Sequence, residues 1–352
     1  MPRKPKLNSS RKFPPTYFIL PFLLIFLFIV SYFLFGPHNL SHREEVVILE
    51  DGLTPQEIGE ILFEKGLIWN KLHFTQEARA EHLYAFFKGG EYFLTSEMGV
   101  PEIVRRLKEH EVLKYKFMIP EGATIEKMAE IFSQVPLRSV ENTVSSTPFI
   151  QKDKFLALAK EGKDKFDFPF KNQNPLPSLE GYLFPDTYIL PRMSEEDLIR
   201  TMLENLKDHL NPDLLDRIRK MGWSVHEVLT LASIVEREAG VEEEKPIIAS
   251  VFFNRLEMGM KLESDPTVLY SLGDPQRPLT YEDLEFDSPY NTYLYPGLPP
   301  GPIGNPGLSS IEAVLYPSST GYYYFVAKGD GHHLFAETYQ EHLENIRSLG
   351  GE

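Results

Sequence analysis

The chain has 352 residues, 36 Lys and Arg against 51 Asp and Glu, a formal net charge of −15 and no cysteine. This length suffices for about two domains, and the acidic balance argues against a nucleic-acid partner. Without cysteine, disulfides, thiolate metal sites, a cysteine nucleophile and a lipidated cysteine anchor are excluded.

The charge is distributed unevenly along the chain. Residues 1–36 contain five Lys or Arg residues and no acid, so the net charge splits into +5 before residue 37 and −20 after it. Residues 16–36 are uncharged and largely apolar. As a helix this segment would be about 30 Å long, the thickness of a bilayer core. It therefore predicts one transmembrane helix.

A cleaved signal peptide is the alternative interpretation of this segment. Its apolar region would be only about 7–15 residues long and would end in small residues, whereas this run is longer and has no such ending. The positive-inside rule makes residues 1–15 a cytoplasmic basic tail. We therefore expect a single-pass protein of the cell (cytoplasmic) membrane with an extracytoplasmic body.

Three segments then show the order short apolar strand, turn, amphipathic helix: residues 46–62, 92–107 and 116–132. Any strand–turn–helix unit can give this pattern. A more specific interpretation is a small βα module that binds extended glycans, similar to LysM modules. The expected fold is α+β: a LysM-like module over 44–113, then a mixed α/β catalytic domain over 114–348.

A well-delimited helix is predicted after Trp223. Ser224 and Glu227 form an S-x-x-E capping box, and Gly240 supplies a stop. At 100° per residue, one side of this helix is apolar. The opposite side is expected to face solvent and carries polar residues, namely His226, Thr230, Ser233 and Arg237.

One acidic residue lies on the apolar side of this helix. Glu236 lies inside the apolar arc, between Val225 and Leu229, whereas Glu238 falls on the border of the arc. The arrangement favours Glu236 without excluding Glu238. A carboxyl on an apolar face must be paired, open to a cleft or protonated, and a raised pKa would make it a general acid. The alternative is a structural salt bridge, for example with Arg255.

Residues 288–307 combine tyrosines with a Pro-Gly segment. Nine of the twelve residues from Pro296 to Gly307 are Pro or Gly, and Tyr290, Asn291 and Tyr293 precede them. Aromatic faces and amides suit sugar rings; a surface loop pinned by tyrosines is the alternative. The histidines near the C-terminus form no metal-ligand motif, so no metal or cofactor is expected.

Six blocks resemble the YceG-like family of endolytic murein transglycosylases. In family order they are LEGYLFPDTY (179–188), LASIVEREAG (231–240), VFFNRLEMGMKLESDPTV (251–268), SPYNTYLYPGLPPGPIGNPG (288–307), YYFVAKGDGHHLF (323–335) and TYQEH (338–342). The region before them matches the LysM-like part of the family more loosely.

The resemblance implies a lyase that cleaves nascent peptidoglycan glycan strands between N-acetylmuramic acid and N-acetylglucosamine, forming 1,6-anhydro-muramoyl ends and terminating elongation. It implies that Glu236 is the catalytic acid, then base. The same carry-over assigns substrate contacts to Asn254, Glu263, Asp265, Tyr290, Asn291, Tyr293 and Asn305. Cell-wall synthases are the expected protein partners.

Two alternatives to this activity remain. A muramidase-type hydrolase would need a second carboxylate, either Glu238 or Asp265. A non-catalytic glycan-binding scaffold would recruit cell-wall synthases without cutting. Glu263 stands where the family usually has Gln, so a second acid facing the cleft would weaken the expectation of a single active carboxyl.

Overall fold

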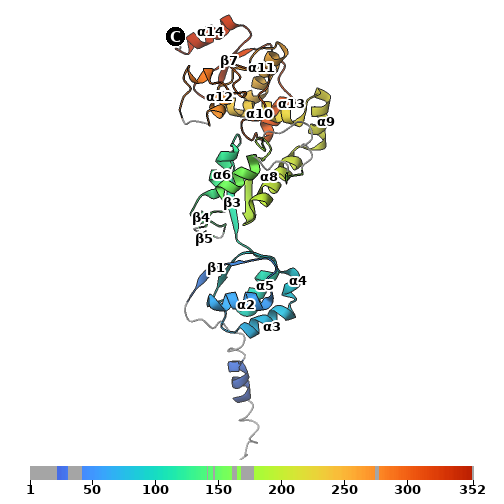
Figure 1. Ribbon diagram of the computed structural model, residues 1–352, viewed down its shortest axis with the longest axis vertical. Helices are drawn as coiled ribbons and strands as arrows, with labels where there is room; N and C mark the ends of the chain where they lie inside the picture. Colours follow the sequence, from blue (N-terminus) through green and yellow to red (C-terminus); the bar gives the residue numbers. More distant parts are fainter. Residues whose placement is uncertain are drawn as a thin grey trace, which may run out of the picture. The chain divides into compact units, whose positions relative to one another are not determined.

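The computed structural model describes residues 22–30, 42–140, 142–145, 147–160, 165–167, 178–273 and 277–350 (Figure 1). Its contacts divide the chain into two compact units, Met1–Lys114 and Tyr115–Glu352. Residues 22–30 are helical, and within the described residues no helix has the length and apolar character needed to cross a bilayer. The rest of the expected 16–36 helix and the basic tail over 1–15 lie outside the described residues.

The first unit is built around one antiparallel strand pair. β1 (Glu44–Leu49) pairs with β2 (Gly90–Thr95), with Val47 opposite Tyr92. Its helices are α2 (Pro55–Glu64), α3 (Lys71–Ala80), α4 (Leu83–Phe86) and α5 (Val100–Lys108). Apolar residues of both strands and of α2, α3, α4 and α5 form one buried cluster. The expected strand–turn–helix order over 46–62 and 92–107 is confirmed by β1–α2 and β2–α5.

The second unit is mixed α/β and mostly helical. β3 (Lys114–Met118) and α6 (Ile125–Ser133) confirm the third strand–turn–helix segment. The remaining elements are β4 (Leu137–Arg138), β5 (Val144–Ser145), α7 (Lys152–Lys160), β6 (Thr187–Pro191), α8 (Glu195–His209), α9 (Pro212–Met221), α10 (Val225–Glu238), η2 (Glu242–Glu244), α11 (Lys245–Glu257), α12 (Asp265–Ser271), η3 (Asp283–Glu285), α13 (Leu308–Leu315), β7 (Tyr324–Ala327), β8 (His333–Ala336) and α14 (Tyr339–Ser348). Among the residues that the structure describes, the strands of this unit form three two-stranded sheets, β3–β6, β4–β5 and β7–β8.

Helix α10 lies at the centre of this unit and contacts α9, α11, α12 and α13 (Figure 1). The predicted capping box forms: the Ser224 hydroxyl accepts from the backbone N–H of Glu227, whose carboxylate accepts from the N–H of Ser224. The expectation of a solvent-facing side is wrong. Thr230 and Ser233 are buried, because another chain segment covers this side.

The covering segment is the Pro-Gly run, in which residues 301–307 are all buried. It hydrogen-bonds the polar side of α10: His226 Nε2 is 2.8 Å from the Pro300 carbonyl, and Ser233 Oγ accepts from the Ile303 N–H at 3.0 Å. A Pro-Gly segment has few side-chain atoms, so its backbone can approach a helix closely. The polar residues of α10 therefore satisfy buried backbone groups.

Candidate active site

Glu238, at the C-terminal end of α10, opens onto a cavity of about 300 Å³. Asp265 and Glu263 line the same cavity from the start of α12 and the turn before it, and Tyr293 lines it from the segment after η3. The Ser264 hydroxyl donates a 2.5 Å hydrogen bond to Glu238 Oε1. Tertiary contact between α10 and α12 thus brings three acids and a tyrosine together at one cavity.

The environment of Glu238 favours its protonated form. Burial raises the pKa of Glu238 to about 7; the hydrogen bond from Ser264 opposes this rise, and the nearby Asp265 carboxylate adds to it. A carboxyl with such a pKa can hold a proton near neutral pH. Glu238 can therefore donate a proton to a bound group and later accept one.

Glu236 has the opposite surroundings. Its Oε1 is 3.1 Å from the ammonium of Lys245, and its Oε2 accepts from the Gly307 N–H at 2.9 Å. The side chains of Glu236 and Lys245 are only 8% and 3% exposed. Both contacts stabilise a carboxylate and tie α10 to α11 and to the Pro-Gly run. The structural salt bridge considered above therefore exists, but with Lys245 in place of Arg255.

Two glycines near these acids are closely approached by other parts of the chain. A Cβ at Gly307 would lie 2.0 Å from Glu121 Oε1, and a Cβ at Gly240 would lie 2.2 Å from the Gly331 carbonyl oxygen. At Gly240 the close atoms belong to the backbone, so only glycine fits there, whereas at Gly307 they are the end of the flexible Glu121 side chain, which can move. Gly240 thereby lets the β7–β8 turn approach the chain two residues after Glu238.

Arg255 and Glu263 form an ion pair at the wall of the cavity. Arg255 Nη1 is 3.0 Å from Glu263 Oε2 and also donates to the carbonyls of Lys261 and Leu262 at 3.1 and 3.0 Å. Glu263 has a φ of 51°, a left-handed conformation that is uncommon outside glycine. Its N–H donates to the Thr292 carbonyl at 3.2 Å. These contacts hold the Glu263 backbone in place, and its carboxylate lies at the cavity.

The C-terminal hairpin and helix also line this cavity. Phe325 of β7, His333 of β8 and His342 of α14 line the cavity. His333 Nδ1 is 2.7 Å from Glu244. The His342 ring stacks on Tyr324 with centroids 5.3 Å apart, and burial lowers the pKa of His342. In the described ranges no group of three or more His, Asp or Glu side chains has a metal-binding arrangement.

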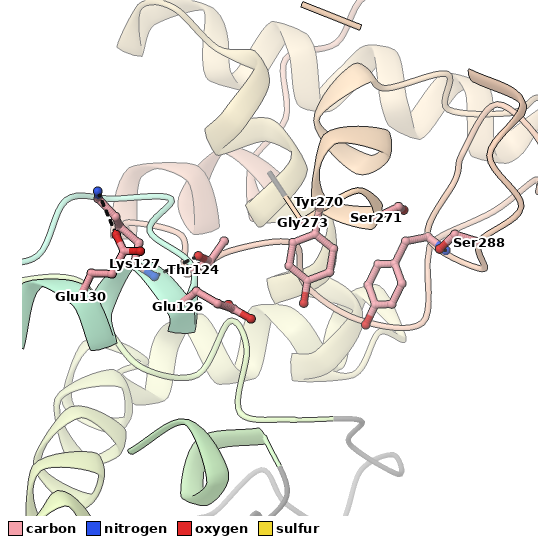
Figure 2. Close-up of a pocket in the computed structure, with 9 residues that line it drawn as sticks. Thr124, Glu126, Lys127, Glu130, Tyr270, Ser271, Gly273 and Ser288 are labelled. Atoms are coloured by element: carbon pink, nitrogen blue, oxygen red, sulfur yellow. Dashed lines mark hydrogen bonds and ion pairs between the residues drawn. The ribbon is translucent and has the colours of Figure 1, made fainter. Parts of the chain in front are cut away.

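A second, larger cavity of about 630 Å³ lies between α6 and α12 (Figure 2). Tyr270 and Ser271 line it from the end of α12, and Ser288 and Tyr290 from the following segment. The expected site residues thus lie at two different cavities. Glu263, Asp265 and Tyr293 line the cavity of Glu238, whereas Tyr290 lines the larger cavity.

Three predicted substrate-binding amides are engaged inside the protein. The amide of Asn254 donates to the carbonyls of Thr320 and Tyr322, and that of Asn291 to those of Leu284 and Phe286. Asn305 donates to Glu180 and to the Ala123 carbonyl. Asn291 and Asn305 are fully buried, and none of the three lines either cavity. These hydrogen bonds give the three amides a structural role.

Sequence reasoning did not assign Arg255 or Tyr270 to a cavity, and it did not predict the hydrogen bond from Ser264 to Glu238. Arg255 and Ser264 fall within matching blocks of the sequence, but nothing in their spacing shows that Arg255 lines the cavity or that Ser264 contacts Glu238. Tyr270 follows the last matching residue of its block by two positions. Its place at the end of α12 opposite α6 becomes visible only in the folded chain (Figure 2).

A mixed α/β unit with one proton-holding carboxyl at a cavity has an arrangement suited to acid–base chemistry. The model of the YceG-like family matches residues 47–348. The chain therefore belongs to the YceG-like family.

Curated relatives include the endolytic murein transglycosylase of Bacillus subtilis, 38% identical over 73% of this chain and 71% of that protein. That of Streptococcus pneumoniae serotype 2 is 30% identical over 88% of this chain, which spans only 59% of the relative. Among solved structures, a yceG-like protein of Listeria monocytogenes is 34% identical, with a TM-score of 0.58 over 86% of this chain and 98% of that one.

Proposed function

We propose that this protein is an endolytic peptidoglycan lytic transglycosylase that cleaves nascent glycan strands between N-acetylmuramic acid and N-acetylglucosamine. The names of the curated relatives support this activity. The main structural observation in favour of this reaction is that the carboxyl of Glu238 lies at a cavity and has a pKa near 7. We assign the acid–base role to Glu238 in place of Glu236, because Glu236 is engaged with Lys245 and Gly307.

One carboxyl completes the reaction. Protonated Glu238 donates its proton to the glycosidic oxygen as the bond from that oxygen to the muramoyl anomeric carbon breaks. The resulting carboxylate then accepts the proton of the muramoyl 6-hydroxyl, whose oxygen bonds to the anomeric carbon. The products are a 1,6-anhydro-muramoyl end and a free N-acetylglucosamine 4-hydroxyl. No water is consumed, and Glu238 regains its proton.

A hydrolase is the second candidate, because Asp265 and Glu263 line the same cavity. Either carboxylate would supply the second acid that glycoside hydrolysis uses. Tyr293 donates a 2.7 Å hydrogen bond to Asp265 Oδ1, and Arg255 pairs with Glu263, so both acids are already engaged. This engagement favours the single-carboxyl mechanism.

The deciding experiment is a digest of nascent, uncross-linked glycan analysed by mass spectrometry. The lyase gives anhydro-muramoyl ends, and the hydrolase gives ends heavier by one water. A scaffold that only binds glycan gives neither product. Replacing Glu238 with Gln should abolish product formation in either enzymatic case, while the circular dichroism spectrum stays that of the wild type.

We propose further that residues 16–36 anchor the protein in the cell membrane as a single helix, with residues 1–15 in the cytoplasm and the body outside. The uncharged segment and the basic residues before it support this topology. The β–α–α–α–β–α order of residues 44–108 in the first unit supports a LysM-like, glycan-binding role for that unit. An anchored enzyme would act beside cell-wall synthases as partners. Accessibility of residues introduced at either end of the anchor to a membrane-impermeant label tests the topology.

A further inference from the structure

The larger cavity has no part in the acid–base step, yet it has the composition of a binding site. Thr124, Glu126, Lys127 and Glu130, at the start of α6 and along it, lie on one side of the cavity (Figure 2). Tyr270, Ser271 and Ser288 lie on the other side. All of these residues belong to the second unit. A volume of about 630 Å³ is large enough for a sugar ring with its substituents.

Two tyrosines form the aromatic wall. The rings of Tyr270 and Tyr290 are 5.0 Å apart and inclined by 52°. Both residues are half-buried. Burial raises the pKa of Tyr290 to about 12, so its hydroxyl remains a donor at neutral pH. Such faces accept the apolar C–H side of a pyranose, and the hydroxyls of Thr124, Ser271 and Ser288 can bond its polar groups.

The charges at the cavity are already compensated by the protein itself. Glu126 forms an ion pair with Lys160. Glu130 lies 3.4 Å from the ammonium of Lys127 and 3.6 Å from that of Lys152. A charged ligand would therefore have to displace existing partners, whereas an uncharged one would not. This compensation favours a neutral sugar over a free amine or a carboxylate.

The two cavities share two structural elements. Asp265 begins α12 and lines the Glu238 cavity, whereas Tyr270, near the end of α12, lines the larger one. The two residues are five positions apart in the helix, about 7.5 Å along the axis. In the segment after η3, Tyr293 lines the first cavity and Tyr290 the second. Both cavities thus take residues from α12 and from this segment, so a single glycan strand can reach both.

We infer that the larger cavity is a second saccharide subsite, which binds an uncharged N-acetylhexosamine ring of the strand that is cut at Glu238. This inference rests on the proposed function and adds to it. Occupancy of both cavities requires several consecutive sugars, so the subsite selects long strands over short fragments. It therefore gives a structural reason for cutting within a strand.

The test compares binding of two uncharged probes, the N-acetylglucosamine disaccharide and hexasaccharide, by calorimetry. The parent is the full-length Glu238→Gln variant, which binds without cutting. We expect the parent to bind the hexasaccharide more tightly than the disaccharide. Adding Tyr290→Leu, which keeps apolar bulk but removes the aromatic face, should weaken hexasaccharide binding about 2- to 10-fold. The matched control is Tyr281→Leu, at a tyrosine 92% exposed, and it should keep the preference.

A second variant covers the case in which Leu at position 290 disturbs folding. Glu130 lies on α6, on the opposite wall, and its side chain is 50% exposed. Glu130→Trp should obstruct the cavity without touching the tyrosines and cause the same loss. Equal affinity of the parent for both probes, or an unchanged preference in Tyr290→Leu and Glu130→Trp, would overturn the subsite. The glycan digest with wild-type protein tests the proposed function separately, because anhydro ends can form whether or not the subsite exists.

Discussion

Glu236 and Glu238 lie two residues apart on one helix, yet Glu236 contacts the Lys245 ammonium at 3.1 Å whereas Glu238 accepts a hydrogen bond from Ser264 and opens onto a cavity. Residues two apart on a helix point in directions about 200° apart. One side therefore places a carboxylate in a buried ion pair, and the other places a protonated acid at a site. The division between structural and chemical roles follows from this geometry.

Replacing each acid in turn tests this division. Glu238→Gln should lower product formation at least about 100-fold, because the proton donor is lost. Glu236→Gln keeps the acceptor for Gly307 and should retain most activity while lowering the melting temperature. Release of anhydro-muropeptides from uncross-linked glycan, followed by mass spectrometry, measures both. Full loss in Glu236→Gln, with Glu238→Gln active, would reverse the assignment.

The pH profile should report the acid at the cavity. Because Glu238 must begin protonated, kcat/KM should fall as the pH rises above about 7, where the pKa of Glu238 lies. The Asp265 carboxylate raises that pKa, so Asp265→Asn should move the falling limb to lower pH. The readout is the pH at which kcat/KM falls, because the maximum value of kcat/KM also depends on any contact between Asp265 and the substrate. A limb that stays in place would exclude this influence of Asp265.

The buried ion pair should matter strongly for stability. Lys245→Met leaves the Glu236 carboxylate buried without its cation and should cost about 3–5 kcal/mol in the free energy of unfolding. Combining it with Glu236→Gln should recover part of this loss. The matched control is Arg219→Met, at an exposed pair with Asp216, for which we expect about 0.5 kcal/mol or less. Urea unfolding of the wild type, the two single variants and the double variant gives these free energies. Equal losses in Lys245→Met and Arg219→Met would argue against a special contribution of the buried ion pair.

Glu180 should make stability depend on pH. It is 3% exposed, and burial raises the pKa of Glu180 from 4.5 to about 8. Between these values the folded state keeps a proton that the unfolded state releases, so stability falls as the pH rises, by about 1.4 kcal/mol per pH unit.

Glu180→Gln removes this titration and can still accept from the Ile125 N–H and the Asn305 amide. Its stability should therefore decline less between pH 5 and pH 8 than that of the wild type, as measured by urea unfolding at both pH values. The same substitution at the exposed Glu344 should leave the wild-type decline unchanged. Parallel declines in wild type and Glu180→Gln would show that Glu180 does not titrate in this range.

Local patterns in the sequence determined much of the secondary structure. The Ser224–Glu227 capping box and the apolar spacing after it specify α10, because both signals act within a few residues. The three strand–turn–helix segments are visible for the same reason. The matching sequence blocks identified the family and the region of the site around residues 231–240.

Only the tertiary structure decided which acid meets the cavity. The apolar arc singled out Glu236, since a helical wheel treats one side of a helix as buried and the other as wet. In the folded unit the Pro-Gly run covers the polar side of α10, and α11 supplies Lys245 from nine residues further along the chain. Contacts between residues distant in sequence leave no local periodicity. The burial of Glu238 beside Ser264 and Asp265 therefore follows from tertiary packing alone. The raised pKa of Glu238 follows from the same packing.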